Sequence, residues 1–326
     1  MLRLLTFVLL CIISLTLSSG NSSPLAIPLG LDRIIPIPAN NLPTKEKIEL
    51  GEKLFFDTML SRNSTVSCAS CHQPENAFTD NNPVAIGIDD RIGSRRTPAL
   101  INRAYGRSFS WDGRAESLEE QVLLPITNPL EMDMDLDKLT ERLNKIPEYR
   151  IAFERMFDSA VTVEGIAFAL SSFIRSLFSG NSPFDRYMQG EKNALSPSAH
   201  RGMQLFRGKA RCIDCHVGPN FTDEQFHNTG VAFRDSIFTD KGRYLVTGNE
   251  KDTGAFKTPT LREVEHTAPY MHNGSKKTLK DVIEFYDRGG NPNPFISDEI
   301  QPLQLTEEEK QDLKNFLKTL SGDWVR

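Results

Sequence analysis

The sequence CASCH at residues 68–72 contains two cysteines three positions apart and a histidine directly after the second. On one helical turn this spacing places the sulfur atoms of Cys68 and Cys71 on the same side, and His72 can then ligate an iron held over the turn. This is the attachment pattern of c-type haem, in which two thioethers hold the porphyrin and the histidine is the proximal iron ligand. The pattern returns once, in CIDCH, as Cys212, Cys215 and His216.

Two other sites could use paired cysteines: a four-cysteine zinc site and a redox-active dithiol. A zinc site of that kind would leave both histidines without a role. The chain has only 6 histidines in 326 residues, so two chance placements after Cys-x-x-Cys would be needed. The sequence therefore predicts a di-haem c-type cytochrome with two covalently bound haems.

Length and charge narrow the class of protein further. A chain of 326 residues suits two domains of modest size. The formal net charge of −5 argues against nucleic acid as a partner.

Residues 1–20 have the features of an export signal. Arg3 gives a positive start, residues 4–17 are almost wholly apolar, and residues 18–20 are small. The apolar run is short for a membrane span, although an uncleaved anchor is the alternative interpretation. Cys11 lies inside this segment, so the four remaining cysteines all belong to the haem motifs. Since c-type haem is attached outside the cytoplasm, we expect a periplasmic protein.

The haem motifs belong to a longer internal repeat. A Gly-x-x-Leu-Phe segment precedes each motif (51–55 and 202–206), and a Phe-Thr-Asp segment follows each (78–80 and 221–223). Further on, the copies align at a constant spacing of 161 residues, which pairs Pro98 with Pro259, Trp111 with His272, and Leu118 with Leu279. Repetition on this scale indicates two copies of one structural unit.

Both units have helical patterns and few strand signals, so the predicted fold is mainly α, with two tandem cytochrome c-like haem domains of class I type. We assign residues 21–43 to a leader arm without a core of its own, 44–190 to the N-terminal domain and 191–326 to the C-terminal domain. Helices are expected after the caps Thr44 and Thr306, and at 118–124, 136–143, 163–178 and 279–285. The last helix, 307–320, should pack across the first helix of its unit.

Several long segments of the chain resemble the bacterial di-haem cytochrome c peroxidase family, including its MauG-like branch. They run from about residue 49 to 320 and are LGEKLFFDTMLSRNSTVSCASCH (50–72), RRTPALIN (95–102), WDGRAESLEEQVLLPITNPLEM (111–132), ARCIDCH (210–216), FHNTGV (226–231), TPTLRE (258–263) and TAPYMHNGSKKTL (267–279). The resemblance therefore covers most of the chain after the export signal.

The resemblance implies different roles for the two haems. The N-terminal haem, with proximal His72, would be the peroxidatic one. Its distal pocket would hold Gln121, which orients peroxide, and Glu131, which moves protons. Trp111 would carry electrons between the haems, and the C-terminal haem on His216 would receive them from a donor.

Two departures from the family pattern concern the iron ligands. Many members carry a blocking histidine in the loop that here reads AIGIDD (85–90), but no histidine lies between His72 and His200. The first haem is therefore expected to be open and high-spin. The distal ligand of the second haem is methionine in classical members and tyrosine in MauG-like members, and the matching residue here is Tyr286. Met271 and His272 are the competing ligands.

A third departure concerns a calcium ion that the family holds between the haems. Two of its ligands would be the backbone carbonyls of Thr267 and Pro269. The third, an asparagine in the family, is Arg96 here. A cation cannot replace a calcium ligand, which argues against calcium in this chain.

The predicted function is reduction of hydrogen peroxide to water, with electrons from a small periplasmic cytochrome c or cupredoxin. The alternative enzyme is a MauG-like oxidase that modifies a protein partner. A plain electron-transfer cytochrome is the third reading, and an open iron beside Gln121 and Glu131 argues against it. The family also suggests a homodimer.

Overall fold

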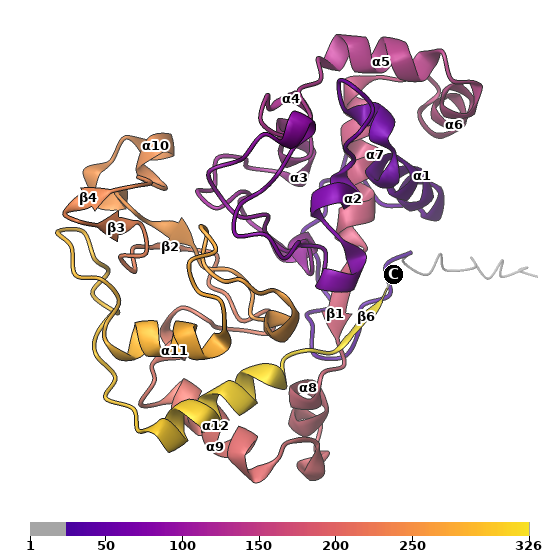
Figure 1. The fold of residues 1–326 in the computed structure, drawn as a ribbon. Helices are drawn as coiled ribbons and strands as arrows, with labels where there is room; N and C mark the ends of the chain where they lie inside the picture. The colour runs from indigo at the N-terminus through magenta and orange to yellow at the C-terminus, as the bar shows by residue number, and fades with distance from the viewer. Residues whose placement is uncertain (1–23, 326) are drawn as a thin grey trace, which may run out of the picture.

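The computed structural model describes residues 24–325, so the predicted export signal at 1–20 lies outside the described residues. The chain forms two mainly helical lobes (Figure 1). The N-terminal lobe contains α1 (Lys45–Phe56), α2 (Cys68–Cys71), α3 (Leu118–Gln121), α4 (Leu124–Thr127), α5 (Leu136–Asn144), α6 (Pro147–Phe157) and α7 (Val163–Arg175). The C-terminal lobe contains α8 (Pro183–Met188), α9 (Pro197–Arg207), α10 (Tyr244–Thr247), α11 (Leu279–Asp287) and α12 (Glu307–Lys318).

The strands are short and antiparallel. Strand β1 (Phe178–Gly180) pairs with β6 (Asp323–Val325), β2 (Phe226–His227) with β5 (Phe256–Lys257), and β3 (Phe233–Arg234) with β4 (Ile237–Phe238). The β1–β6 pair joins the chain between the lobes to the C-terminal end (Figure 1). The predicted mainly α class is confirmed.

Each lobe is built on one crossing of two helices. Helix α1 packs on α7, where a Cβ on Gly51 would lie 2.0 Å from the Ala169 carbonyl oxygen. Helix α9 packs on α12 in the same way, and Gly202 approaches the Asp312 carbonyl equally closely. Only glycine permits backbones this close. The repeated Gly-x-x-Leu-Phe segment is thus the point at which each helix pair crosses.

Helix boundaries follow the predicted caps. The Thr44 hydroxyl accepts the Lys47 N–H, and Thr306 forms a capping box with Glu309. The predicted packing of the last helix across the first helix of its unit is confirmed by the α12–α9 crossing. The helix expected at 118–124 instead divides into α3 and α4, and the helix expected at 163–178 ends at Arg175, before β1 begins. Helix α6 was not predicted.

The leader arm follows the seam between the lobes. Its apolar side chains, Leu25 among them, pack with Ala104 and Phe178 in a small third cluster. Its backbone carbonyl at Gly30 accepts a hydrogen bond from Arg262 of the C-terminal lobe. Phe184 and Tyr187 of α8 pack against the C-terminal core, and the predicted division at 190/191 stays a prediction. Among the residues described, no helix combines the length and apolar character needed to cross a bilayer.

Candidate functional site: a two-haem cavity

One cavity of about 530 Å³ extends between the two lobes and is lined by both Cys-x-x-Cys-His motifs. The predicted site residues that line it are Cys68, Cys71, His72, Trp111, Gln121, Glu131, Cys212, Cys215, His216, Thr267 and Tyr286, together with Arg96, Met271 and His272. Pro269 is not among the lining residues. The fold therefore brings two predicted haem sites, about 140 residues apart in sequence, into one enclosure.

The two proximal histidines are held in the same way. His72 Nδ1 lies 2.9 Å from the Phe78 carbonyl oxygen, and His216 Nδ1 lies 2.9 Å from the Phe221 carbonyl oxygen. Both phenylalanines have positive φ, at 56° and 51°, so the two turns share the same backbone conformation at this residue. A carbonyl can only accept, so Nδ1 carries the proton and Nε2 is left as the ligating atom. Burial lowers the pKa of both rings, which favours the neutral form that binds iron.

These residues fit two c-type haems. The four cysteines of the two motifs are free thiols, so each motif can form two thioethers. When bound, each haem supplies a redox-active iron, and only an iron with an open axial position can take a small ligand such as peroxide.

Gln121 lies at the C-terminal end of α3 and is oriented by Ser110. The Ser110 hydroxyl donates to Gln121 Oε1 at 2.6 Å, which leaves the amide NH₂ free to donate into the cavity. Ser110 has a positive φ of 64°, which the turn before Trp111 requires. Ser110 could not be identified from the sequence, because its partner is eleven residues away across a turn.

Glu131 is positioned by Asn128. The Asn128 amide donates to Glu131 Oε1 at 2.6 Å. Burial raises the pKa of Glu131, and the Asn128 hydrogen bond works in the opposite direction. A carboxyl with a raised pKa is closer to the range in which it can both accept and release protons. The i, i+3 spacing of the two residues could have suggested Asn128 from sequence.

Replacing Asn128 with alanine is expected to move the acid limb of the peroxide turnover profile to higher pH. Without the amide donor, the pKa of Glu131 rises further, so the carboxylate needed as a base is formed only at higher pH. The measurement is kcat/KM for peroxide as a function of pH, with exposed Asn249→Ala as the control. An acid limb at the wild-type position would show that Asn128 does not tune Glu131.

The loop at 85–93 contributes Ala85, Gly87 and Gly93 to the cavity wall and contains no histidine that could block the iron. The Ile88 N–H donates to the Glu131 carbonyl at 2.7 Å, and the Ile88 side chain is fully buried. A Cβ on Gly87 would lie 2.2 Å from the Leu130 carbonyl oxygen, so only glycine fits there. Ion pairs from Arg91 to Asp89 and Asp133 stabilise the solvent-exposed side of the loop. The loop therefore supports the segment that carries Glu131 and supplies no nitrogen ligand.

Three candidate distal ligands of the second haem, Tyr286, Met271 and His272, line the cavity. Tyr286 lies on α11, and its hydroxyl has no hydrogen-bond partner among the described residues. Burial raises the pKa of the Tyr286 phenol, and the nearby Cys215 and Cys212 sulfurs act in the same direction. The His272 ring is stacked on Phe256, with centroids 3.6 Å apart and planes 10° apart. The Tyr286 ring instead makes an edge-on contact with Phe285, with centroids 5.6 Å apart, so its face is not covered by that ring.

Trp111 connects the two halves through hydrogen bonds. Its indole N–H donates to the Arg96 carbonyl at 2.7 Å, and the Arg96 N–H donates to the His272 carbonyl at 2.7 Å. The Trp111 carbonyl accepts the Lys257 N–H of the C-terminal lobe at 2.8 Å. Trp111 is thus hydrogen-bonded to segments from both lobes.

The Arg96 side chain lies where the family resemblance would put calcium. Its Nη2 donates to the Asp80 carbonyl at 2.6 Å and to the Ala268 carbonyl at 3.0 Å, between the predicted ligands Thr267 and Pro269. A calcium ion needs several oxygen ligands, and a guanidinium among them repels it. The residues present therefore do not fit calcium.

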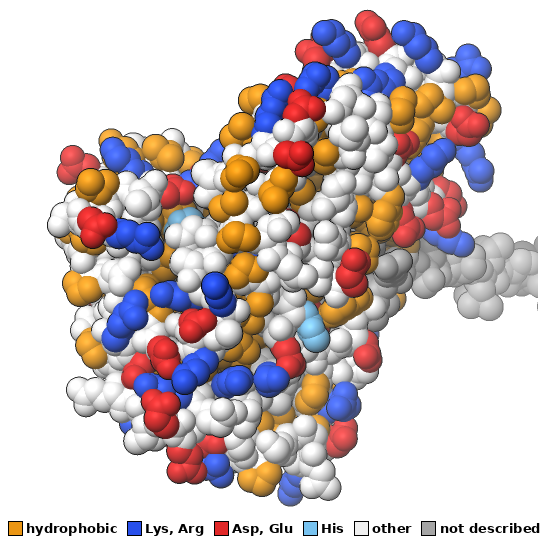
Figure 2. Space-filling view, viewed as in Figure 1, with side chains coloured by type: hydrophobic (Ala, Val, Ile, Leu, Met, Phe, Trp, Pro, Cys, Tyr) orange, Lys and Arg blue, Asp and Glu red, His pale blue; other side chains and the backbone are white. Residues whose placement is uncertain are grey.

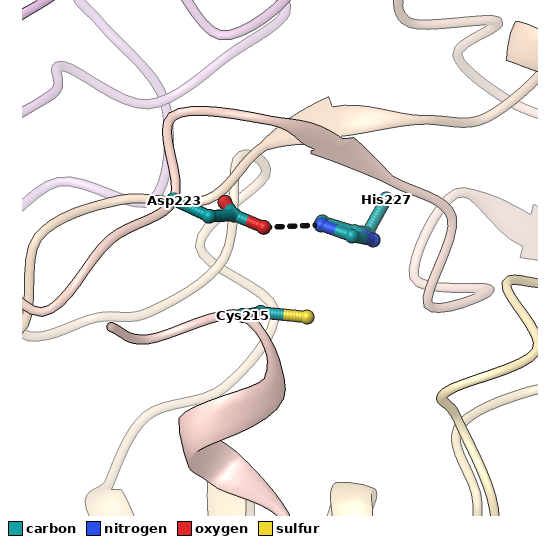
Figure 3. A group of neighbouring side chains, drawn as sticks. All are labelled: Cys215, Asp223 and His227. Carbon is teal, nitrogen blue, oxygen red and sulfur yellow. Dashed lines mark hydrogen bonds and ion pairs between the residues drawn. The ribbon is translucent and has the colours of Figure 1, made fainter. Parts of the chain in front are cut away.

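His227 was not predicted and lies beside the second haem motif. Its Nε2 is 2.8 Å from Asp223 Oδ2, and the Cys215 sulfur points toward the same space (Figure 3). Once Cys215 forms a thioether it is no longer a thiolate donor, so this group does not make a separate metal site. The pair instead fixes an imidazole at the cavity wall. His227 lies in the segment FHNTGV (226–231), which resembles the family, but the sequence alone gave this histidine no role.

Taken together, the fold and the cavity define a di-haem c-type cytochrome with catalytic potential. Comparison with known proteins agrees with that class. Residues 45–193 match the family described as di-haem cytochrome c peroxidase, and residues 199–321 match cytochrome c. The chain is 40% identical to methylamine utilization protein MauG of Methylorubrum extorquens over 291 residues, covering 89% of this chain and 82% of that protein.

It is 37% identical to cytochrome-c peroxidase IdrP1 of Pseudomonas sp., covering 88% of this chain and 84% of that protein. A solved structure of a MauG-like protein associated with microbial copper homeostasis superposes with a TM-score of 0.84 at 33% identity, covering 91% and 96% of the two chains. The chain therefore belongs to the bacterial di-haem cytochrome c peroxidase and MauG family. It is an oxidoreductase with two c-type haems and two cytochrome c-like domains. The roles of Trp111, Gln121, Glu131 and Tyr286 stay predictions.

Proposed function

We propose that this protein reduces hydrogen peroxide to water at the N-terminal haem, with electrons that enter at the C-terminal haem. The observation that supports this most directly is the shared cavity, in which Gln121 and Glu131 lie with His72 while Trp111 contacts both lobes. Relatives named cytochrome-c peroxidase give independent support.

The reaction consumes two electrons and two protons for each peroxide converted to two waters. Glu131 would accept a proton from hydrogen peroxide and return it to the departing hydroxyl oxygen, so that the leaving group is water. The free amide of Gln121 donates to the peroxide and holds it in line with Glu131. Trp111 would carry electrons toward the first haem, and its indole N–H donates to a backbone carbonyl. Because a carbonyl does not accept a proton at neutral pH, Trp111 passes an electron without losing its proton.

The oxidised protein is expected to show one high-spin and one low-spin haem by electron paramagnetic resonance. The chain has no histidine between His72 and His200, and a backbone hydrogen bond ties the loop at 85–93 to the segment that carries Glu131. Ile88→Ala introduces no side chain that can ligate iron, so this control variant should keep the same two signals. Two low-spin signals in the untreated ferric protein would show that another residue closes the first iron.

A MauG-like oxidation of a protein partner is the second candidate. The observation that favours it is Tyr286, which lines the shared cavity and matches the tyrosine of that branch, and a MauG protein is among the relatives. Lys and Arg side chains are interspersed with Asp and Glu on the face shown in Figure 2, so that face is not specialised for a strongly charged partner.

The deciding test is steady-state peroxide turnover with a reduced small cytochrome c or cupredoxin, without prior reduction of the enzyme. Rapid turnover, with two molecules of a one-electron donor oxidised for each peroxide consumed, supports the peroxidase. Negligible turnover, together with slow decay of the peroxide-oxidised protein, would favour the protein-modifying oxidase. We also propose that the protein is periplasmic, on the export signal predicted at 1–20. The homodimer stays a prediction.

A further inference from the structure

Arg96 and Lys257 occupy equivalent positions in the two copies of the repeat. Each stands directly before a Thr-Pro pair, and their numbers differ by the same 161 residues that relate Trp111 to His272. The Arg96 N–H donates to the His272 carbonyl at 2.7 Å, and the Lys257 N–H donates to the Trp111 carbonyl at 2.8 Å. The two lobes therefore exchange matching backbone hydrogen bonds across an approximate two-fold relation.

Both side chains are buried in the cavity without enough negative charge to balance them. Arg96 is 5% exposed and Lys257 is 8% exposed. Arg96 bonds only to backbone carbonyls, and its Nε has no partner among the described residues. Asp80 offers Arg96 its carbonyl, while its carboxylate bonds to Thr97.

Lys257 shares its one acid with a third cation. Its Nζ donates to the Ser108 carbonyl at 2.6 Å and lies 3.5 Å from Glu224, which forms a 2.8 Å ion pair with Arg103. Burial lowers the pKa of Arg96 to about 10 and that of Lys257 to about 7, which shows how poorly the protein alone solvates these charges. Buried charge that lacks a partner is strongly unfavourable. An anion from outside the chain should balance both.

We propose that Arg96 and Lys257 are a pseudo-symmetric pair of cations that bind haem propionates, Arg96 at the first haem and Lys257 at the second. The assignment follows from the chain, because the backbone of Pro98 interacts with the His72 ring and the backbone of Pro259 interacts with the His216 ring. Each haem carries two propionates, and these are the anions that enter this cavity with the cofactor. The Arg96 guanidinium thereby supplies a positive charge between the lobes without a metal ion. The inference rests on the two haems and not on the proposed peroxidase activity.

A buried positive charge beside a propionate stabilises the ferrous haem, which has one positive charge less than the ferric haem. Removing the charge should therefore lower the reduction potential of that haem. Arg96→Gln and Lys257→Gln keep a hydrogen-bond donor and remove the charge. Each is expected to shift the ferric–ferrous equilibrium of its own haem at least tenfold toward ferric, which is about 59 mV for one electron. The other haem should shift much less.

The measurement is a spectroelectrochemical titration of the full holoprotein, with both haem potentials resolved. The charge-keeping variants Arg96→Lys and Lys257→Arg should stay near the wild-type potentials, and the exposed substitutions Arg107→Gln and Lys277→Gln are the matched controls. In each glutamine variant the potential of the affected haem should also depend more strongly on pH near neutrality. A propionate that has lost its cation binds a proton more readily, which a purely structural role would not produce.

Three results would overturn the proposal: unchanged potentials, equal shifts of both haems in each variant, or the same shift in the charge-keeping variants. A potential of the wild-type protein that varies with added inorganic phosphate would also count against it, since the balancing anion would then come from solution. If Lys257→Gln does not fold, Glu224→Gln provides the test. It removes the competing acid and should raise the potential of the second haem, and an unchanged or lower potential would contradict the assignment of Lys257.

Discussion

Glu131→Gln is expected to lower peroxide turnover by a factor of about 10² to 10⁴ while both haems stay attached. The substitution keeps the size of the side chain and its hydrogen bond with Asn128, but it removes the group that accepts and returns a proton. The measurements are steady-state turnover with a reduced small donor, and the visible spectrum of each haem. Spectra that match the wild type would show that the loss comes from the missing carboxylate.

The pH dependence provides a second check on Glu131. Burial raises the pKa of this carboxyl, so the carboxylate is present above that raised pKa and is lost as the pH falls through it. Wild-type turnover should therefore fall on the acid side, and this limb should disappear from the residual activity of the variant. Exposed Glu116→Gln, on the same segment, is the control and should behave as wild type. Near-normal turnover in Glu131→Gln would show that Glu131 does not transfer protons in the reaction.

Tyr286→His is expected to raise the reduction potential of the second haem while that haem stays six-coordinate and low-spin. A phenolate is a harder, anionic donor that stabilises ferric iron, whereas a neutral imidazole stabilises it less. The oxidised form that peroxide generates across both haems should then be shorter-lived. Peroxide reduction with a small donor should persist, because Gln121 and Glu131 are unchanged. The measurements are the potential, the paramagnetic resonance spectrum, and the lifetime of the peroxide-oxidised protein.

Tyr244→Phe is the control for Tyr286, because it removes a phenol of the same lobe that does not line the cavity. A wild-type spectrum and potential in Tyr286→His would exclude Tyr286 as the ligand. Met271→Leu would then be the next variant, since Met271 also lines the second half of the cavity. A long-lived oxidised form in the wild-type protein that is lost in Tyr286→His would favour the protein-modifying oxidase.

Local sequence determined the haem sites and the repeat. Cysteines at i and i+3 followed by histidine specify an attachment chemistry that needs only one helical turn, so Cys68, Cys71 and His72 could be identified before any fold was known. Helix caps such as Thr44 and Thr306 were equally readable, because a cap bonds to a backbone N–H three residues away. The helix expected at 118–124 was wrong in detail, since Pro125 opens a new turn and α3 stops at Gln121.

Tertiary structure decided which residues act together in the cavity. Ser110 orients Gln121 across a turn, and Arg96 reaches a carbonyl 172 residues further along the chain. Such contacts depend on how the lobes pack, and no local pattern encodes that packing. The sequence showed that Arg96 departs from the calcium pattern, but only the fold showed that its guanidinium bonds to carbonyls of both lobes. The repeat by itself determined that there are two haem units, whereas the charge between them results from side chains that meet only when the two units pack together.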